Sequence, residues 1–108
     1  MKISQIKDAL GFEVVNLPEE DRDIGSVFCC DLLSLVMSRA PADCAWVTVM
    51  GNVNTAAVAL LADVSCIIVA ENCAVDQDML EKVRDKEIAV FKTELPVFEA
   101  AMAVQKLI

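Results

Sequence analysis

Three apolar runs of this sequence each end in polar side chains that could bind a ligand. The run "IGSVFCC" is followed by Asp31, "CAWVTVM" by a Gly-Asn-Val-Asn segment, and "CIIVA" by Glu71 and Asn72. If the runs are parallel strands, these side chains share one edge of a sheet, where open α/β proteins bind ligands. Helix N-termini at that edge favour anionic groups. We therefore predict a ligand site there, with the candidate residues Cys30, Asp31, Ser34, Gly51, Asn52, Asn54, Glu71 and Asn72.

These polar residues also have purely structural interpretations. Asp31 is a good N-cap for the helix expected after it. Asn52 and Asn54 suit a turn and a helix cap. Glu71 and Asn72 suit a solvated loop. Both interpretations stay open, because a capping residue can also face a bound molecule.

Catalytic and metal-binding patterns are weak. The chain has no histidine, so the commonest general base is missing. No GxSxG, GxxxxGK(S/T) or GxGxxG motif occurs, and Ser26 and Ser34 have no evident base partner. The five cysteines form no CxxC pair, and the adjacent Cys29 and Cys30 would point to opposite faces of a strand. We therefore predict reduced structural thiols, no catalytic residue, no metal and no cofactor.

Composition narrows the class of protein. The 108 residues are 56% hydrophobic, enough for one domain whose core needs no disulfide. The net charge of −8, with only nine Lys and Arg, argues against nucleic acid and membrane surfaces as partners. The most apolar region, residues 56–70, is interrupted by Asp63 and Ser65 and is too short to span a bilayer. No signal peptide is evident, so we expect a cytoplasmic protein.

Strand-like and helical segments alternate along the chain. The expected strands cover residues 12–17, 24–30, 44–50, 66–70 and 88–92. The expected helices run from a Ser4 cap to Leu10, from residue 32 to about 39, over 55–62, from an Asp76 cap to Lys86, and from a first turn containing Pro96 to near residue 107. The inner strands are apolar on both faces, so helices must cover both faces of the sheet. This predicts a three-layer α/β/α fold with a largely parallel or mixed central sheet of about five strands.

The region from residue 21 to residue 71 carries a family resemblance. Its centre is Phe28 followed by Asp-Leu-Leu-Ser at residues 31–34, then "AWVT" at 45–48 and "GNVN" at 51–54. In the order and spacing of these elements the chain resembles the DRTGG domain, and a weaker resemblance continues through residues 96–99. The chain departs from that family at Ser26 and Val27, which replace a Gly-Gly pair, and at Gly25, which replaces a Thr.

The resemblance implies a single DRTGG-like domain over residues 1–108, with a fold similar to the N-terminal domains of HPr kinase and the Mur ligases. The Mur ligase domain holds a uridine nucleotide, and DRTGG domains also occur beside CBS domains, which sense adenine nucleotides. The implied function is a non-catalytic regulatory domain that binds a small ligand, with a nucleotide as the candidate. The alternative is a dimeric interaction module without a ligand of its own, docking onto a redox enzyme of the iron-hydrogenase type or onto a kinase.

The expected helices over residues 32–37 and 55–62 carry more apolar surface than one face of a sheet covers. A helix that is apolar all round must be buried on more than one side. Large exposed apolar patches in soluble proteins mark interaction sites. The sequence therefore predicts a homodimer.

Overall fold

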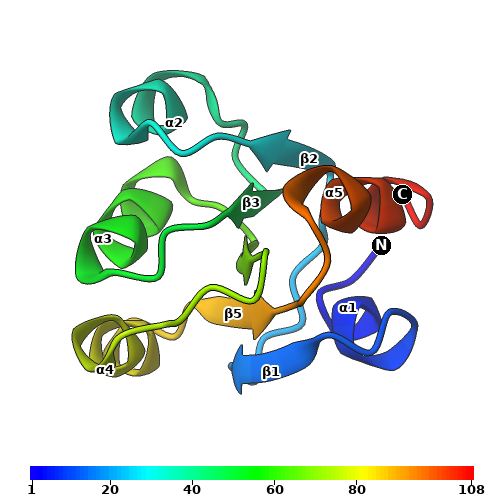
Figure 1. Ribbon diagram of the computed structural model, residues 1–108, viewed down its shortest axis with the longest axis horizontal. Coiled ribbons are helices and arrows are strands. Elements are labelled where there is room, and N and C mark those ends of the chain that lie inside the picture. The colour runs from blue at the N-terminus through cyan, green and yellow to red at the C-terminus, as the bar shows by residue number, and fades with distance from the viewer.

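The chain folds into alternating helices and strands, and every element expected from the sequence is present (Figure 1). The structure is a computed structural model that describes residues 1–108. The elements are α1 (Ser4–Asp8), β1 (Glu13–Asn16), β2 (Ser26–Cys29), α2 (Leu33–Arg39), β3 (Cys44–Thr48), α3 (Val53–Ala62), β4 (Cys66–Val69), α4 (Gln77–Asp85), β5 (Ala89–Lys92) and α5 (Val97–Gln105).

The five strands form one mixed sheet in the order β1-β5-β4-β3-β2. The four strands from β2 to β5 run parallel to one another, while β1 lies antiparallel to β5. The carboxyl ends of β2 to β5 therefore share an edge with the amino end of β1, and we call this the carboxyl edge.

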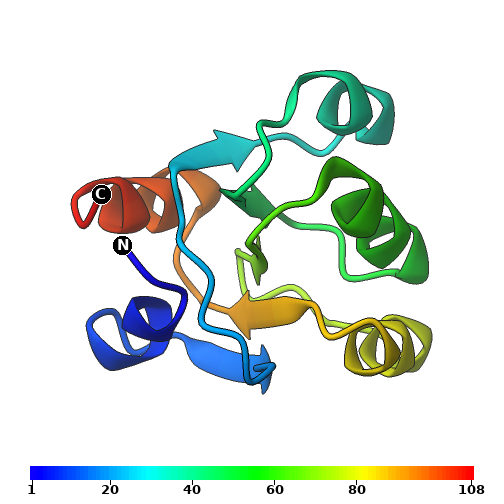
Figure 2. The same cartoon turned by 180° about the vertical axis from the view of Figure 1, so that it is seen from behind.

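Helices cover both faces of the sheet. The helices α2, α3 and α4 lie on one face, and α1 and α5 lie on the other (Figures 1 and 2). Each face has its own cluster of 13 buried apolar residues. Within β3, Ala45 and Val47 pack toward α1 and α5, whereas Trp46 packs toward the other three helices. This alternation confirms the predicted α/β/α fold and explains why the inner strands are apolar on both faces.

The helix ends match some of the local signals in the sequence. The Asp76 carboxylate accepts the Met79 N–H at 2.8 Å and caps α4, as predicted. Gly11 follows α1 with a φ of 68°, a conformation that glycine adopts easily. The predicted Ser4 cap is wrong: Ser4 is the first helical residue, and its hydroxyl donates to Asp21 at 2.7 Å instead.

The helices are short, from 5 residues in α1 to 10 in α3. None of them has the length and apolarity that crossing a bilayer requires.

Candidate functional site

The chain changes faces of the sheet between two neighbouring strands. After β4 it continues into α4 on one face, and after β5 it continues into α5 on the opposite face (Figure 1). Where connections from adjacent parallel strands leave on opposite faces, a crevice opens beyond the strand ends. The fold therefore favours the carboxyl ends of β4 and β5 as a ligand site.

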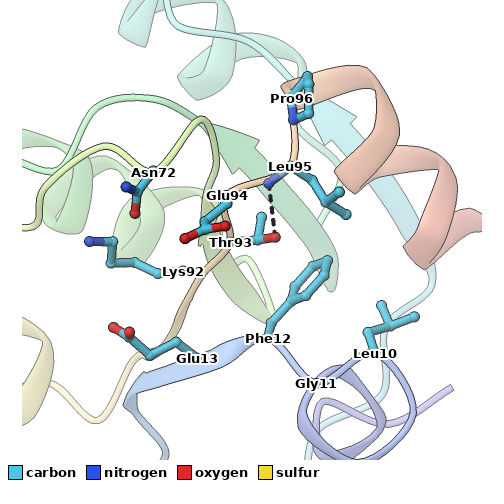
Figure 3. Close-up of a pocket in the computed structure, with 10 residues that line it drawn as sticks. All are labelled: Leu10, Gly11, Phe12, Glu13, Asn72, Lys92, Thr93, Glu94, Leu95 and Pro96. Atoms are coloured by element: carbon cyan, nitrogen blue, oxygen red, sulfur yellow. Dashed lines mark hydrogen bonds between the residues drawn. The ribbon is translucent and has the colours of Figure 1, made fainter.

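An open cleft of about 710 Å³ lies at this position. The strand β5 and the segment after it form one wall, the start of β1 forms another, and Asn72 closes it from the β4 side (Figure 3). The lining residues are Leu10, Gly11, Phe12, Glu13, Asn72, Lys92, Thr93, Glu94, Leu95 and Pro96.

Polar groups in the cleft are held by backbone contacts. The Asn72 N–H donates to the Thr93 carbonyl at 3.0 Å, and the Leu95 N–H donates to the Thr93 hydroxyl at 3.2 Å. Lys92 and Glu13 lie together on one side of the cleft and Phe12 on the other (Figure 3). The cleft therefore has a mainly polar lining of amide, hydroxyl and charged groups beside the apolar side chains of Leu10, Phe12 and Leu95.

Asp31 has a different role from the predicted helix cap. The residue at the N-cap position of α2 is Leu32, and no side chain caps that helix. The Asp31 carboxylate instead accepts the Thr48 hydroxyl at 2.7 Å and the Val49 N–H at 3.0 Å. The cap prediction failed because the partners are 17 and 18 residues away in sequence and belong to the neighbouring strand end.

Cys30 precedes Asp31 in the connection from β2 to α2, and Ser34 follows it within α2. The Cys30 carbonyl accepts the Trp46 indole N–H at 2.9 Å, and its thiol is half-buried 3.7 Å from the Leu32 carbonyl. Ser34 is exposed in the first turn of α2. Cys30 thus has a packing role at the carboxyl edge, while Ser34 is open to solvent.

Gly51, Asn52 and Asn54 form the connection from β3 to α3. The Asn52 side chain caps α3 by accepting the N–H groups of Asn54 and Thr55 at 3.0 and 3.3 Å. A Cβ on Gly51 would lie 1.8 Å from the Ala74 carbonyl oxygen, so this position requires glycine. The structure thus gives Gly51 and Asn52 roles in the fold and leaves the Asn54 side chain exposed.

Glu71 and Asn72 follow β4 in left-handed backbone conformations, with φ of 60° and 54°. The Glu71 carboxylate accepts the Val97 N–H at 3.0 Å at the start of α5. It thereby occupies the positive end of that helix. Asn72 is the only predicted site residue that lines the large cleft.

The sequence interpretation missed the residues contributed by β5 and β1. Lys92, the last residue of the buried strand β5, begins a polar run with Thr93 and Glu94, a signal similar to the one that selected Asp31 and Glu71. The contribution of Phe12 and Glu13 depends on the antiparallel pairing of β1 with β5, with Glu13 opposite Lys92. That pairing has no local signature in the sequence.

Three of the five thiols have a raised pKa. Burial raises the pKa of Cys44 to about 11 and also raises the pKa of Cys66. Partial desolvation and then the Asp31 carboxylate raise the pKa of Cys29 on the edge strand β2. These three thiols therefore stay protonated at neutral pH, the form that is a poor nucleophile and metal ligand. No group of three or more Cys, Asp and Glu side chains is arranged to hold a metal ion.

Comparison with known proteins supports the fold. No protein family and no curated protein matches the sequence of this chain. The structure is similar to the crystal structure of the CBS and DRTGG domains in the regulatory region of Clostridium perfringens pyrophosphatase, complexed with its activator, diadenosine tetraphosphate. The TM-score is 0.75 at 20% identity, over 93% of this chain and 44% of that chain. The DRTGG-like fold predicted from the sequence is thus confirmed, and this chain spans less than half of that regulatory region.

Proposed function

We propose that this chain is a non-catalytic regulatory domain that binds a nucleotide at the carboxyl edge of its sheet. The observation that carries the proposal is the cleft of about 710 Å³ beyond β4 and β5, where the chain changes faces. Asn72 and Thr93 offer amide and hydroxyl groups that match ribose hydroxyls and base edges. Glu94 adds a carboxylate acceptor at the rim.

The similar pyrophosphatase region supports a regulatory role, because it is a regulatory region and its structure contains a nucleotide activator. The lack of histidine, phosphate-binding loop and nucleophile motif supports a non-catalytic role. The interaction module without a ligand has less support, since the similar protein is a ligand-binding regulator.

Calorimetric titration with a panel of nucleotides tests this proposal, and two variants locate the site. Asn72→Gly removes a side chain from the cleft at a φ of 54° that glycine tolerates. Asn54→Ala removes an exposed amide at the start of α3. We expect wild type to bind at least one nucleotide and Asn72→Gly to weaken it. If only Asn54→Ala weakens binding, the site lies at the β3 end of the edge instead. A wild type that binds no nucleotide at millimolar concentration would refute the function.

A further inference from the structure

A second, smaller pocket adjoins the cleft and has a different charge. It has a volume of about 310 Å³ and lies between β1 and α4. Its lining residues are Glu13, Val15, Ala74, Val75, Leu80, Arg84 and Lys92. Glu13 and Lys92 also line the large cleft, so the two hollows meet at this cross-strand pair.

The local structure explains why these side chains converge. Alternation along β1 and β5 places Glu13, Val15 and Lys92 on the face of the sheet that α4 covers. Leu80 and Arg84 are four residues apart on α4, so they share one face of that helix. The Asn16 amide fixes β1 beside α4, because it donates to the carbonyls of Val83 and Ile88 at 3.1 and 2.8 Å.

The pocket is a cationic spot on an acidic protein. Two of the nine Lys and Arg of a chain with net charge −8 face this pocket, against the single carboxylate of Glu13. Neither Arg84 nor Lys92 takes part in any of the ion pairs or side-chain hydrogen bonds of the fold. Val15, Val75 and Leu80 are half-buried around them.

We infer that the phosphate group of the proposed nucleotide binds in this pocket, between the Arg84 guanidinium and the Lys92 ammonium. The large cleft contains Glu13 and Glu94 against Lys92 alone, so it repels phosphate and suits the nucleoside part. Lys92 lines both hollows and lies where the sugar meets the phosphate. This orientation rests on the proposed function. It adds that Arg84 makes the site prefer a nucleotide over the corresponding nucleoside.

Calorimetry tests this inference with adenosine, AMP and inorganic phosphate as probes. The nucleoside and monophosphate of each other base follow. Wild type should bind the monophosphate about tenfold more tightly than its nucleoside, as expected for a charge-assisted contact. Arg84→Gln should remove most of this preference and leave nucleoside affinity unchanged. Arg39→Gln is the matched control, because Arg39 is also exposed in the last turn of a helix but lines neither hollow.

The outcomes separate this inference from the proposed function. If a nucleotide binds and Arg84→Gln behaves like Arg39→Gln, the phosphate position is wrong while the regulatory function stands. A wild type that binds nucleoside and monophosphate equally well also refutes the phosphate position. If no nucleoside, nucleotide or inorganic phosphate binds, both the function and the inference fail. Binding of inorganic phosphate alone, lost in Arg84→Gln, would keep the anion site and refute the nucleotide.

Discussion

The Asp31 carboxylate joins the ends of two neighbouring strands, because it accepts the buried Thr48 hydroxyl and the Val49 N–H. We predict that Asp31→Ala lowers the free energy of unfolding by about 1.5–3 kcal/mol, the range for hydrogen bonds to a charged group. Asp31→Asn should lower it less, since both bonds go to the same carboxylate oxygen, Oδ1, and an amide oxygen can take its place. Urea unfolding of the two variants measures both effects.

A double-mutant cycle with Thr48→Val distinguishes this contact from a general effect of removing charge. We expect the two substitutions to be coupled by about 0.5–3 kcal/mol, as for residues in direct contact. Additive effects of Asp31→Ala and Thr48→Val would contradict the role of Asp31 as a link between strands.

Ser4 and Asp21 give the protein an acid-sensitive contact near its N-terminus. The Ser4 hydroxyl, and then its backbone N–H, donate to Asp21 at 2.7 and 2.9 Å and lower the pKa of that carboxyl below 3.8. Because the folded pKa is the lower one, the contact stabilises the fold above the unfolded pKa and loses its effect as the pH falls through the folded pKa. Ser4→Ala should therefore raise the pKa of Asp21 toward its ordinary value.

An NMR titration of the Asp21 side chain in wild type and Ser4→Ala measures this shift directly. The difference in stability between the two proteins should be present at neutral pH and should narrow in strong acid. An Asp21 pKa that is the same in both proteins would show that the hydroxyl does not perturb it.

At the scale of elements, the β3–α3 connection depends on the close approach of Gly51 to the loop before α4. A Cβ at Gly51 would lie 1.8 Å from the Ala74 carbonyl oxygen and 2.9 Å from the Val75 Cα, both backbone atoms. We predict that Gly51→Ala destabilises the fold by more than about 3 kcal/mol, because one of the two loops must move. Gly25→Ala is the control: a Cβ there meets nothing within 4 Å, and its φ is not in the left-handed region. Thermal unfolding that shifts equally in both variants would contradict the close contact.

The elements themselves were largely predictable from the sequence. Strands β3 and β4 are continuous apolar runs, and such runs are typical of strands buried on both faces. The Asp76 cap and Gly11 marked a helix start and a helix end correctly, because those signals act within a few residues. The helix α3 begins at Val53, two residues before the predicted start at Thr55, because Asn52 rather than Asn54 is its cap.

The candidate site was less predictable, because its parts meet only in three dimensions. Asp31, Glu71 and Asn52 were chosen for their positions after apolar runs, and each makes a structural hydrogen bond in the fold. The large cleft instead draws on β5 and β1, whose antiparallel pairing joins residues about 80 positions apart, as Glu13 and Lys92 show. Of the predicted site residues, only Asn72 lines that cleft.

At the scale of the whole molecule, the homodimer is still a prediction. Exposed apolar residues on α2 and α3 offer a way to test it. Leu61 on α3 is 73% exposed, and Phe98 on the opposite face is 69% exposed. If the α2–α3 face is the interface, Leu61→Glu should convert a dimer into a monomer, because it would bury an unpaired charge. Phe98→Glu should leave the dimer intact. A monomeric wild type at micromolar concentration in sedimentation experiments, or equal effects of both variants, would contradict this prediction.

The most direct test of ligand binding at the carboxyl edge is a titration of isotope-labelled protein with a nucleotide panel, followed by amide chemical shifts. We predict saturable shifts for the amides of Glu13, Asn72 and Thr93, which line the cleft. The amides of Asp43 and Asp63, which Arg22 holds together at the opposite edge of the sheet, should not move. Shifts confined to that opposite edge, or no shift with any nucleotide at millimolar concentration, would contradict the account.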